Sequence, residues 1–255
     1  MLTLNIDPVL VNLGFLEIRY YGLVYVLGFV LTTLYLLYSR EKLNLSKDEV
    51  YDLVFYLMLG VLIGSRIFHI LFWDFSYYLS QPWKIFYLWE GGMSFHGGLL
   101  SSIIGCFYFS KKKKLSFHKL ADFLVVPGLI ALAFGRVANF INGELVGTIT
   151  SVPWCFDFGD NLCRHPYQLY SALKRFALAG FFIILQKYYS FKEGFLFWMM
   201  ILLLGIGRFS LDFFRAETLY LGLTMGQWLS FIMILSSMIV IFKYYSNNNL
   251  FQRKV

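Results

Sequence analysis

Apolar residues fall into seven long stretches, and short segments between them carry most of the charged residues. Each stretch contains about 20 residues, the length at which an α-helix crosses roughly 30 Å of hydrocarbon. The pattern therefore predicts an all-α polytopic membrane protein, folded as a single integral membrane domain over residues 1–255. We expect its spans near residues 20–39, 53–73, 93–110, 122–142, 167–187, 194–214 and 223–245.

The composition agrees with this class. Of the 255 residues, 58% are hydrophobic and only 15% are charged, whereas a soluble domain has roughly a quarter charged residues. A net charge of +7 could indicate a nucleic-acid partner, but the lysines and arginines lie in short loops between apolar stretches. That arrangement is typical of membrane topology and of attraction to anionic lipid. We therefore expect membrane lipid, and no nucleic acid, as the partner of these charges.

The distribution of basic residues predicts the orientation. Lysines gather between spans 1 and 2, between spans 3 and 4 (Lys111 to Lys114), between spans 5 and 6, and in the tail. These loops and the C-terminus are expected in the cytoplasm and the N-terminus outside. Segments 74–92 and 143–166 then lie on the outer face, where the second segment is expected to form a small extracytoplasmic cap. We interpret the tetralysine run as a topology signal, with binding of a specific lipid as the alternative. The N-terminus lacks the basic region of a cleaved signal peptide, so we expect the first span to be retained.

The three cysteines indicate little chemistry. Cys106 lies in an apolar stretch and is expected to be a small core residue. Cys155 and Cys163 share one polar loop and could form a disulfide if it faces an oxidising compartment; free thiols are the alternative. No metal-ligand spacing is present, so we expect neither a metal nor a cofactor.

Polar residues close the fourth apolar stretch. Arg136, Asn139, Asn142 and Glu144 lie within the sequence GRVANFINGELVG at residues 135–147. An arginine in the hydrocarbon costs about 2.5 to 3.5 kcal/mol on insertion scales, so it usually has a partner and a purpose. In helical register we expect five residues of this segment to share one face: Arg136, Asn139, Phe140, Gly143 and Gly147.

Other embedded polar groups fall at a similar depth in the outer half of the membrane: Arg66, Arg208, Tyr21 and His96. Asp212 follows Arg208 at i+4, where the two can pair. Three arginines without enough acids to neutralise them suit an anion, and guanidinium groups suit phosphate oxygens. A phospholipid head group is the natural candidate. Any single arginine could instead fix helix packing, and we favour that structural role for Arg66.

His96 lies in the sequence GGMSFHGG at residues 91–98. A histidine is suited to carrying a proton near neutral pH. Its neighbours Gly97 and Gly98 leave room beside it for a substrate or for another helix.

At these residues the sequence resembles the prolipoprotein diacylglyceryl transferase family. The blocks at 91–98 and 135–147 are similar to its two characteristic motifs. Shorter similarities follow the family's order along the chain: Arg19 to Leu23, Arg164 to Tyr170, Gly207 to Arg215, and Met225 to Gln227.

The resemblance implies an activity. The family moves the diacylglyceryl group of phosphatidylglycerol to the lipobox cysteine of a preprolipoprotein signal peptide, forming a thioether and releasing glycerol phosphate. It implies that Arg136 binds the lipid phosphate and that Arg208 stabilises or places the leaving group. His96 or Tyr21 would assist removal of the thiol proton.

The same resemblance gives supporting roles. Asn139 and Glu144 would orient Arg136 or the glycerol hydroxyls, and Asn142 would bind substrate or cap the helix end. The sequence also departs from the family pattern. Asp212 stands in place of a glutamate, and Ser171 and Arg175 stand where other members carry acids.

Two other functions compete. A phospholipid carrier could use the same arginines without chemistry, but it would need polar groups toward the cytoplasm, and the inner halves of spans 4 and 6 are almost wholly apolar. An intramembrane protease would need a serine–histidine or a paired aspartate arrangement. Ser65 near His69 matches no known nucleophile motif.

Overall fold

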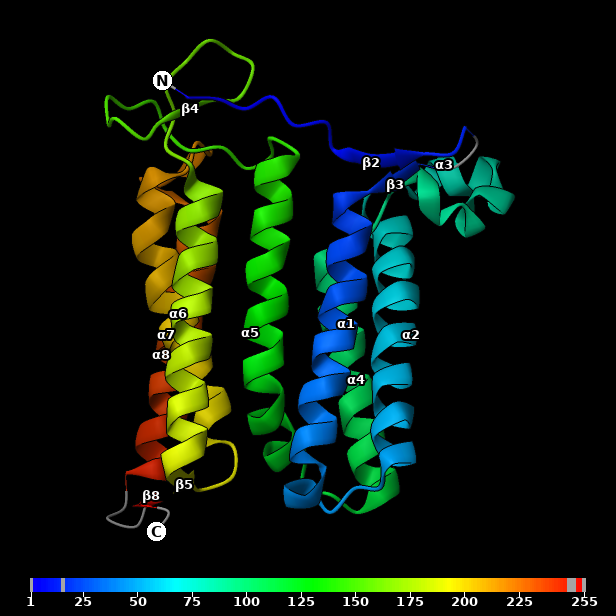
Figure 1. Cartoon of the computed structure of the whole chain (residues 1–255), viewed down its shortest axis with the longest axis vertical. Coiled ribbons are helices and arrows are strands. Elements are labelled where there is room, and N and C mark those ends of the chain that lie inside the picture. Colours follow the sequence, from blue (N-terminus) through cyan, green and yellow to red (C-terminus); the bar gives the residue numbers. More distant parts are fainter. Residues whose placement is uncertain (1, 15–16, 247–250, 254–255) are drawn as a thin grey trace. The chain divides into compact units, whose positions relative to one another are not determined.

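The computed structural model describes residues 2–14, 17–246 and 251–253. Its main elements are eight α-helices: α1 (Tyr20–Ser39), α2 (Lys47–Phe72), α3 (Phe75–Ser80), α4 (Phe95–Lys113), α5 (Phe117–Ile141), α6 (Tyr167–Tyr188), α7 (Phe195–Leu211) and α8 (Met225–Tyr245) (Figure 1). Four short 3-10 helices lie between them: η1 (Arg40–Leu43), η2 (Pro82–Phe86), η3 (Leu88–Glu90) and η4 (Asp212–Phe214).

Short strands pair near the helix ends. They are β1 (Leu2–Thr3), β2 (Val9–Asn12), β3 (Glu17–Arg19), β4 (Phe156–Asp157), β5 (Tyr189–Phe191), β6 (Leu219–Tyr220), β7 (Leu223–Thr224) and β8 (Phe251–Arg253). β1 pairs with β4 in parallel, in register Leu2 to Phe156. The pairs β5–β8 and β6–β7 are antiparallel, and β2 pairs with β3. The strands tie segments together without forming a larger sheet.

Six helices in the described part of the chain are long and apolar enough to cross a membrane. They are Tyr20–Leu43, Lys47–Phe72, Phe117–Ile141, Tyr167–Tyr188, Phe195–Phe214 and Met225–Tyr245. Large apolar side chains on them stay exposed, among them Leu34, Ile232 and Phe242 at 58%, 62% and 66%. Such surfaces suit contact with lipid. The expected all-α polytopic membrane fold is therefore confirmed.

Helix α4 corresponds to the remaining predicted span. It has 19 residues, but it begins with glycines and serines and ends with lysines, so its composition is less apolar than that of the other six. A seventh crossing stays a prediction, as does the single membrane domain.

Local chemistry explains several helix ends. A capping box begins α2, where Ser46 Oγ accepts from the Glu49 amide at 3.2 Å and Glu49 Oε2 accepts from the Ser46 amide at 2.8 Å. The same device begins α8 at Thr224 and Gln227. These reciprocal bonds satisfy amides that have no partner inside the helix. Helix α4 ends at Lys113, because the next residue, Lys114, has a left-handed backbone that stops the helix.

The chain divides into two compact units. The first, here called the α5–α8 unit, contains residues 2–12, residues 18–28 and the described residues from 124 onward. The second, the α2–α4 unit, contains residues 29–123 and the described residues between 13 and 17. The chain passes between the units within α1 and within α5.

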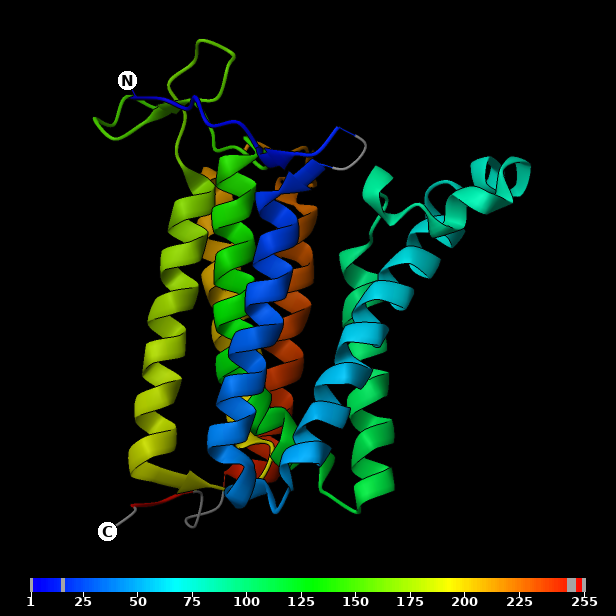
Figure 2. The same cartoon turned by 45° about the vertical axis from the view of Figure 1, so that its right-hand side comes forward.

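Each unit has its own helix packing (Figure 2). In the α5–α8 unit, Gly28 of α1 lies against Ala131 of α5, and Gly205 of α7 lies against the Ser230 turn of α8. In the α2–α4 unit, α2 and α4 run side by side.

Candidate functional site

Arg136 lies in the last two turns of α5 and begins a chain of side-chain hydrogen bonds. Its guanidinium donates to Asn139 Oδ1 at 3.2 Å, and Asn139 Nδ2 donates to Glu144 Oε2 at 2.9 Å. The other carboxylate oxygen, Glu144 Oε1, accepts from Asn142 Nδ2 at 3.1 Å. Asn139 is buried. A buried amide with a partner on each side has a fixed orientation, so it holds the Arg136 head group in place.

The backbone turns back to bring Glu144 to this chain. Helix α5 ends at Ile141, and Gly143 takes a φ of 67°. The Glu144 amide then donates to the Asn139 carbonyl at 2.9 Å. The expected helical face is therefore correct for Arg136, Asn139 and Phe140 only. Its extension to Gly143 and Gly147 is wrong, because the left-handed glycine ends the helix first.

Gly147 lies where the backbone segments around His165 and Phe214 pack closely against it. A Cβ there would be 2.3 Å from the His165 carbonyl oxygen and 2.8 Å from the Phe214 carbonyl oxygen. The Gly147 amide donates to His165 at 3.1 Å, and the Thr148 amide donates to Phe214 at 2.9 Å. The segment after α5 is thereby fixed to the start of α6 and the end of α7.

The same outer segment contains a disulfide between Cys155 and Cys163, which decides between the two alternatives left by the sequence. Nearby, Arg164 Nε lies 2.6 Å from Asp160 Oδ2, and Arg164 also donates to the Gly147 carbonyl at 3.2 Å. The hydrogen bond from Arg164 lowers the pKa of Asp160 below its usual value.

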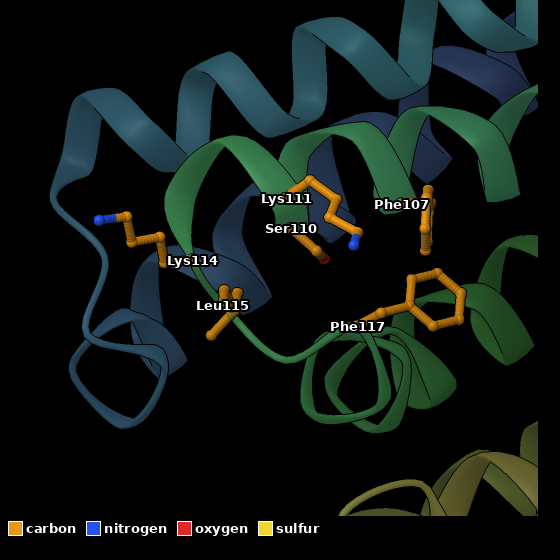
Figure 3. A pocket seen from close by; sticks show the side chains of 6 residues that line it. All are labelled: Phe107, Ser110, Lys111, Lys114, Leu115 and Phe117. Carbon is orange, nitrogen blue, oxygen red and sulfur yellow. The ribbon is translucent and has the colours of Figure 1, made fainter.

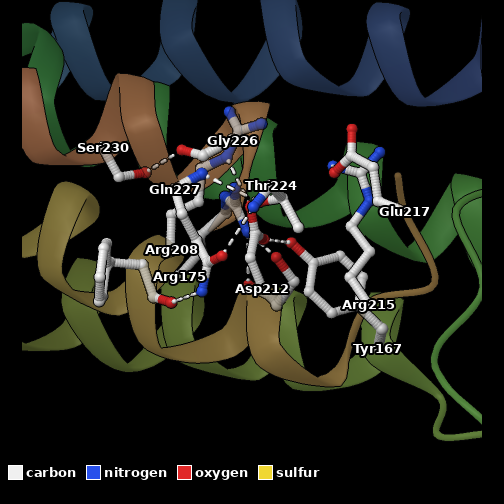
Figure 4. A network of polar contacts seen from close by, with 12 residues as sticks. Tyr167, Arg175, Arg208, Asp212, Arg215, Glu217, Thr224, Gly226, Gln227 and Ser230 are labelled. Atoms are coloured by element: carbon white, nitrogen blue, oxygen red, sulfur yellow. Dashed lines mark hydrogen bonds and ion pairs between the residues drawn. The ribbon is translucent and has the colours of Figure 1, made fainter. Parts of the chain in front are cut away.

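Arg208 and Asp212 form the second part of the site (Figure 4). Arg208 Nε lies 3.5 Å from Asp212 Oδ2, so the predicted i+4 pair is confirmed. The Asp212 carboxylate is fully buried. It also accepts from the Tyr167 hydroxyl at 2.5 Å and from the Thr224 hydroxyl at 3.5 Å. Because several donors hold it, this buried acid is a fixed anchor for the Arg208 side chain.

Gly226 leaves the space that this pair occupies. A Cβ on Gly226 would be 2.2 Å from Asp212 Oδ2 and 2.8 Å from a terminal nitrogen of Arg208. The next residue, Gln227, donates to the Phe209 carbonyl at 3.2 Å and caps α8 through the Thr224 amide. The motif Met225 to Gln227 therefore positions the end of α7 against the start of α8.

More cations surround these two arginines than the sequence analysis assigned to the site. Arg136 interacts electrostatically with Arg208, Arg215 and Tyr167. Lys174 and Arg175 of α6 interact with both Arg136 and Arg208, and Asp212 is the acid that acts on them. Arg175 is buried and donates to the carbonyl and hydroxyl of Ser171. The cluster has a clear excess of positive charge, which an anion would offset.

Lys174 and Tyr167 were missed from sequence. A lysine next to Arg175 inside an apolar span was the available signal for Lys174. No local signal marks Tyr167, because its partner Asp212 lies 45 residues away. Arg215, noted only as part of a motif, pairs with Glu217 at 2.9 Å and lies over the Tyr167 ring.

Of the two expected proton carriers, the structure brings Tyr21 to this cluster. Tyr21 is the second residue of α1 and belongs to the α5–α8 unit. The centre of its ring lies 5.5 Å from the centre of the Tyr25 ring, and Tyr21 interacts electrostatically with Arg136. His96 lies in the first turn of α4, in the other unit, and its side chain is exposed.

Gly97 and Gly98 allow α4 to pack closely on α2. A Cβ on Gly97 would be 2.2 Å from the Gly64 carbonyl oxygen, and one on Gly98 would be 2.6 Å from Ser65 Oγ. Of the two purposes that the sequence left open, contact with a neighbouring helix is the one observed.

Arg66 has a structural role, as expected. It is 4% exposed and donates to five backbone carbonyls, those of Ile85, Gly91, Gly92, Lys84 and Tyr87. The Tyr78 ring lies 5.0 Å from its guanidinium carbon. These bonds use all five N–H donors of an arginine, so none is left for a ligand.

The fold and this site define a polytopic helical membrane protein with a cation cluster among its spanning helices. The sequence model of the family described as prolipoprotein diacylglyceryl transferase matches residues 8–243. The chain belongs to this family, and the resemblance seen in its motifs is confirmed.

Three relatives illustrate the similarity. The phosphatidylglycerol–prolipoprotein diacylglyceryl transferase of Geobacter sulfurreducens is 43% identical, over 91% of this chain and 92% of its own length. Those of Bordetella parapertussis and Legionella pneumophila are 42% and 41% identical, over 91% of this chain and 93% and 94% of their own lengths.

Proposed function

We propose that this protein transfers the diacylglyceryl group of phosphatidylglycerol to the lipobox cysteine thiol of preprolipoproteins, the first step of bacterial lipoprotein maturation. The family assignment supports the transferase activity. The observation that carries the proposal in the structure is the fixed Arg136 within electrostatic reach of Arg208. Together they supply positive charge at the depth of a phospholipid head group.

The reaction needs positive charge in the site because negative charge develops on the lipid phosphate as it leaves. The thiol first loses a proton, since the thiolate is the nucleophile. Its sulfur attacks the carbon of the diacylglyceryl group that is bonded to the phosphate oxygen. A carbon–sulfur bond forms there, and the bond between that carbon and the phosphate oxygen breaks. The phosphodiester monoanion leaves as a glycerol phosphate dianion, and the sulfur becomes a neutral thioether. Cations near the phosphate therefore stabilise the transition state more than the bound lipid.

The named residues divide this work. Arg136 binds the lipid phosphate, and Asn139, Glu144 and Asn142 keep its guanidinium in position. Arg208, held by Asp212, stabilises the leaving group. Arg136 and Arg208 form hydrogen bonds to phosphate oxygens that strengthen as the second charge develops.

Tyr21 and His96 remain the two candidates for the proton acceptor. Tyr21 belongs to the same unit as Arg136 and interacts with it electrostatically. His96 is the residue type most often used to carry a proton near neutral pH. A Tyr21→Phe variant and a His96→Gln variant distinguish them. The acceptor's variant loses activity together with one limb of the pH–rate profile, whereas loss of a binding contact changes KM and leaves the profile in place.

We place the protein in the bacterial cytoplasmic membrane, with the lysine-rich loops inside and segment 143–166 outside. The disulfide in that segment supports this orientation, because disulfides persist in oxidising compartments. The lipid then enters from the outer leaflet, and the signal peptide reaches the site from the same side. α4 would complete seven spans.

The test uses purified protein, phosphatidylglycerol and a lipobox peptide, with mass spectrometry of the peptide. Wild type should add one diacylglyceryl group to the cysteine, and Arg136→Ala should lose at least about 100-fold in rate, the scale for one lost transition-state donor. Arg40→Ala is the matched control. Arg40 directly follows the last residue of α1, whereas Tyr21 of the site lies in the first turn of that helix. Binding of the lipid without modification of the peptide would instead favour a phospholipid carrier.

A further inference from the structure

The four lysines Lys111 to Lys114 face two different environments. Lys112 Nζ lies 3.2 Å from the Tyr56 hydroxyl, and Lys113 Nζ lies 2.9 Å from Glu49 Oε1. Both partners belong to α2, so these two lysines hold α4 against α2. Lys111 and Lys114 have no acidic partner in the described part of the chain; they line a cavity instead.

The cavity lies where α4 ends and α5 begins, within the α2–α4 unit, and has a volume of about 360 Å³. That size falls within the roughly 300 to 1,000 Å³ typical of small-molecule sites. It is lined by Phe107, Ser110, Lys111, Lys114, Leu115 and Phe117, with no acidic residue among them. The lining therefore combines positive charge with apolar surface.

One polar atom in the lining has no partner. Ser110 is 2% exposed, and its hydroxyl oxygen makes no hydrogen bond within the described residues. A buried polar group without a partner is unfavourable, so a ligand that supplies the partner gains affinity. In Figure 3 the Ser110 hydroxyl and the Lys111 ammonium point into the same space, whereas the Lys114 ammonium extends to the other side.

The aromatic residues complete the lining. The rings of Phe107 and Phe117 are 6.0 Å apart between centroids and meet edge to face. The Lys111 ammonium lies 5.4 Å from the centre of the Phe107 ring. Rings beside an ammonium suit the glycerol and acyl part of a lipid next to its phosphate.

We propose that this cavity binds the phosphate of an anionic phospholipid from the leaflet at the lysine-rich end of the helices. Lys111 provides the charge, the Ser110 hydroxyl donates to a phosphate oxygen, and Phe107, Leu115 and Phe117 contact the glycerol backbone. Basic pockets between helices at a membrane face are known to suit such head groups. This site is separate from the Arg136–Arg208 cluster and does not depend on the proposed transferase reaction.

The test is native mass spectrometry of the full chain, released from a neutral detergent, with cardiolipin as the probe. The double variant Lys111→Gln/Lys114→Gln should retain cardiolipin about tenfold more weakly than wild type. The matched control Lys42→Gln/Lys47→Gln removes the same charge from two exposed lysines of the same unit, one in η1 and one at the start of α2. It should bind as wild type does. Cardiolipin held by the Arg136 cluster contributes equally to all variants.

Ser110→Ala tests whether cardiolipin binding can fall while the stability of the fold is kept. Removing a buried hydroxyl without a partner leaves the melting temperature unchanged or higher, while cardiolipin binding should fall about threefold. Equal loss in the two double variants, or no loss in either, overturns the proposal. Displacement of cardiolipin by millimolar inorganic phosphate also overturns it, since the cavity would then take the free ion and not a lipid.

Discussion

Gly226→Ala tests whether the Arg208–Asp212 pair acts in the reaction. The added methyl group would lie 2.2 Å from Asp212 Oδ2 and 2.8 Å from an Arg208 nitrogen. To restore an ordinary contact, the pair has to move by about 1 Å. A misplacement of about 1 Å in a positioning group costs roughly 100-fold in rate, so we expect that loss in kcat. The carboxylate also loses its alignment with the Tyr167 hydroxyl.

The assay is transfer of the diacylglyceryl group to a lipobox peptide, with thermal unfolding measured on the same sample. Gly180→Ala is the control, because a Cβ there meets nothing within 4 Å and the change improves helix propensity by about 1 kcal/mol. It should retain full activity.

Tyr167→Phe loosens the same carboxylate without adding volume. It should lower kcat about tenfold, as expected for one lost hydrogen bond to a charged group. If folded Gly226→Ala stays within twofold of wild type, the argument for the Arg208–Asp212 pair is refuted.

Three further outcomes follow from other contacts. Arg66→Met should lower stability by about 3 kcal/mol, because five carbonyls lose a buried donor; an unchanged melting temperature would contradict this. Replacing Cys155 and Cys163 by serine opens a short loop, with a sequence separation of 8, and should cost about 2 kcal/mol; wild type in reductant should melt at the variant's temperature. Arg164→Gln should raise the pKa of Asp160, followed by NMR of its carboxyl carbon. Because Arg164 lowers the folded pKa, its contribution is present above the ordinary aspartate pKa and is lost as pH falls through the folded value. A pKa that does not move would mean that the ion pair is absent in solution.

The helices were predictable because their length is set by the bilayer and their ends by local chemistry. The first span was expected at 20–39, and α1 covers those residues. The pair of Arg208 and Asp212 was also predictable, since i+4 spacing alone brings the two together.

Other features depend on contacts between distant segments. The exit from α5 at Gly143 was not predictable from periodicity, because a left-handed residue interrupts a face that the sequence pattern continues. Lys174 joins the cluster through helix packing, which brings α6 and α7 together at Gly207. The sequence likewise left two purposes open for Gly97 and Gly98, and only the position of α2 decides between them.

Arg66 donates hydrogen bonds to the backbone carbonyls of residues 84–92, as a neighbouring strand does in a β-sheet. That irregular stretch turns its carbonyls inward, where no ladder of amides meets them, and one side chain supplies the donors. A lysine there would bring only three N–H groups on a single atom and could not reach carbonyls spread over several residues. Trp89 in this segment and Trp83 just before it have exposed side chains. Arg66 thus lets an irregular backbone present its aromatic side chains to a membrane interface without leaving its carbonyls unpaired.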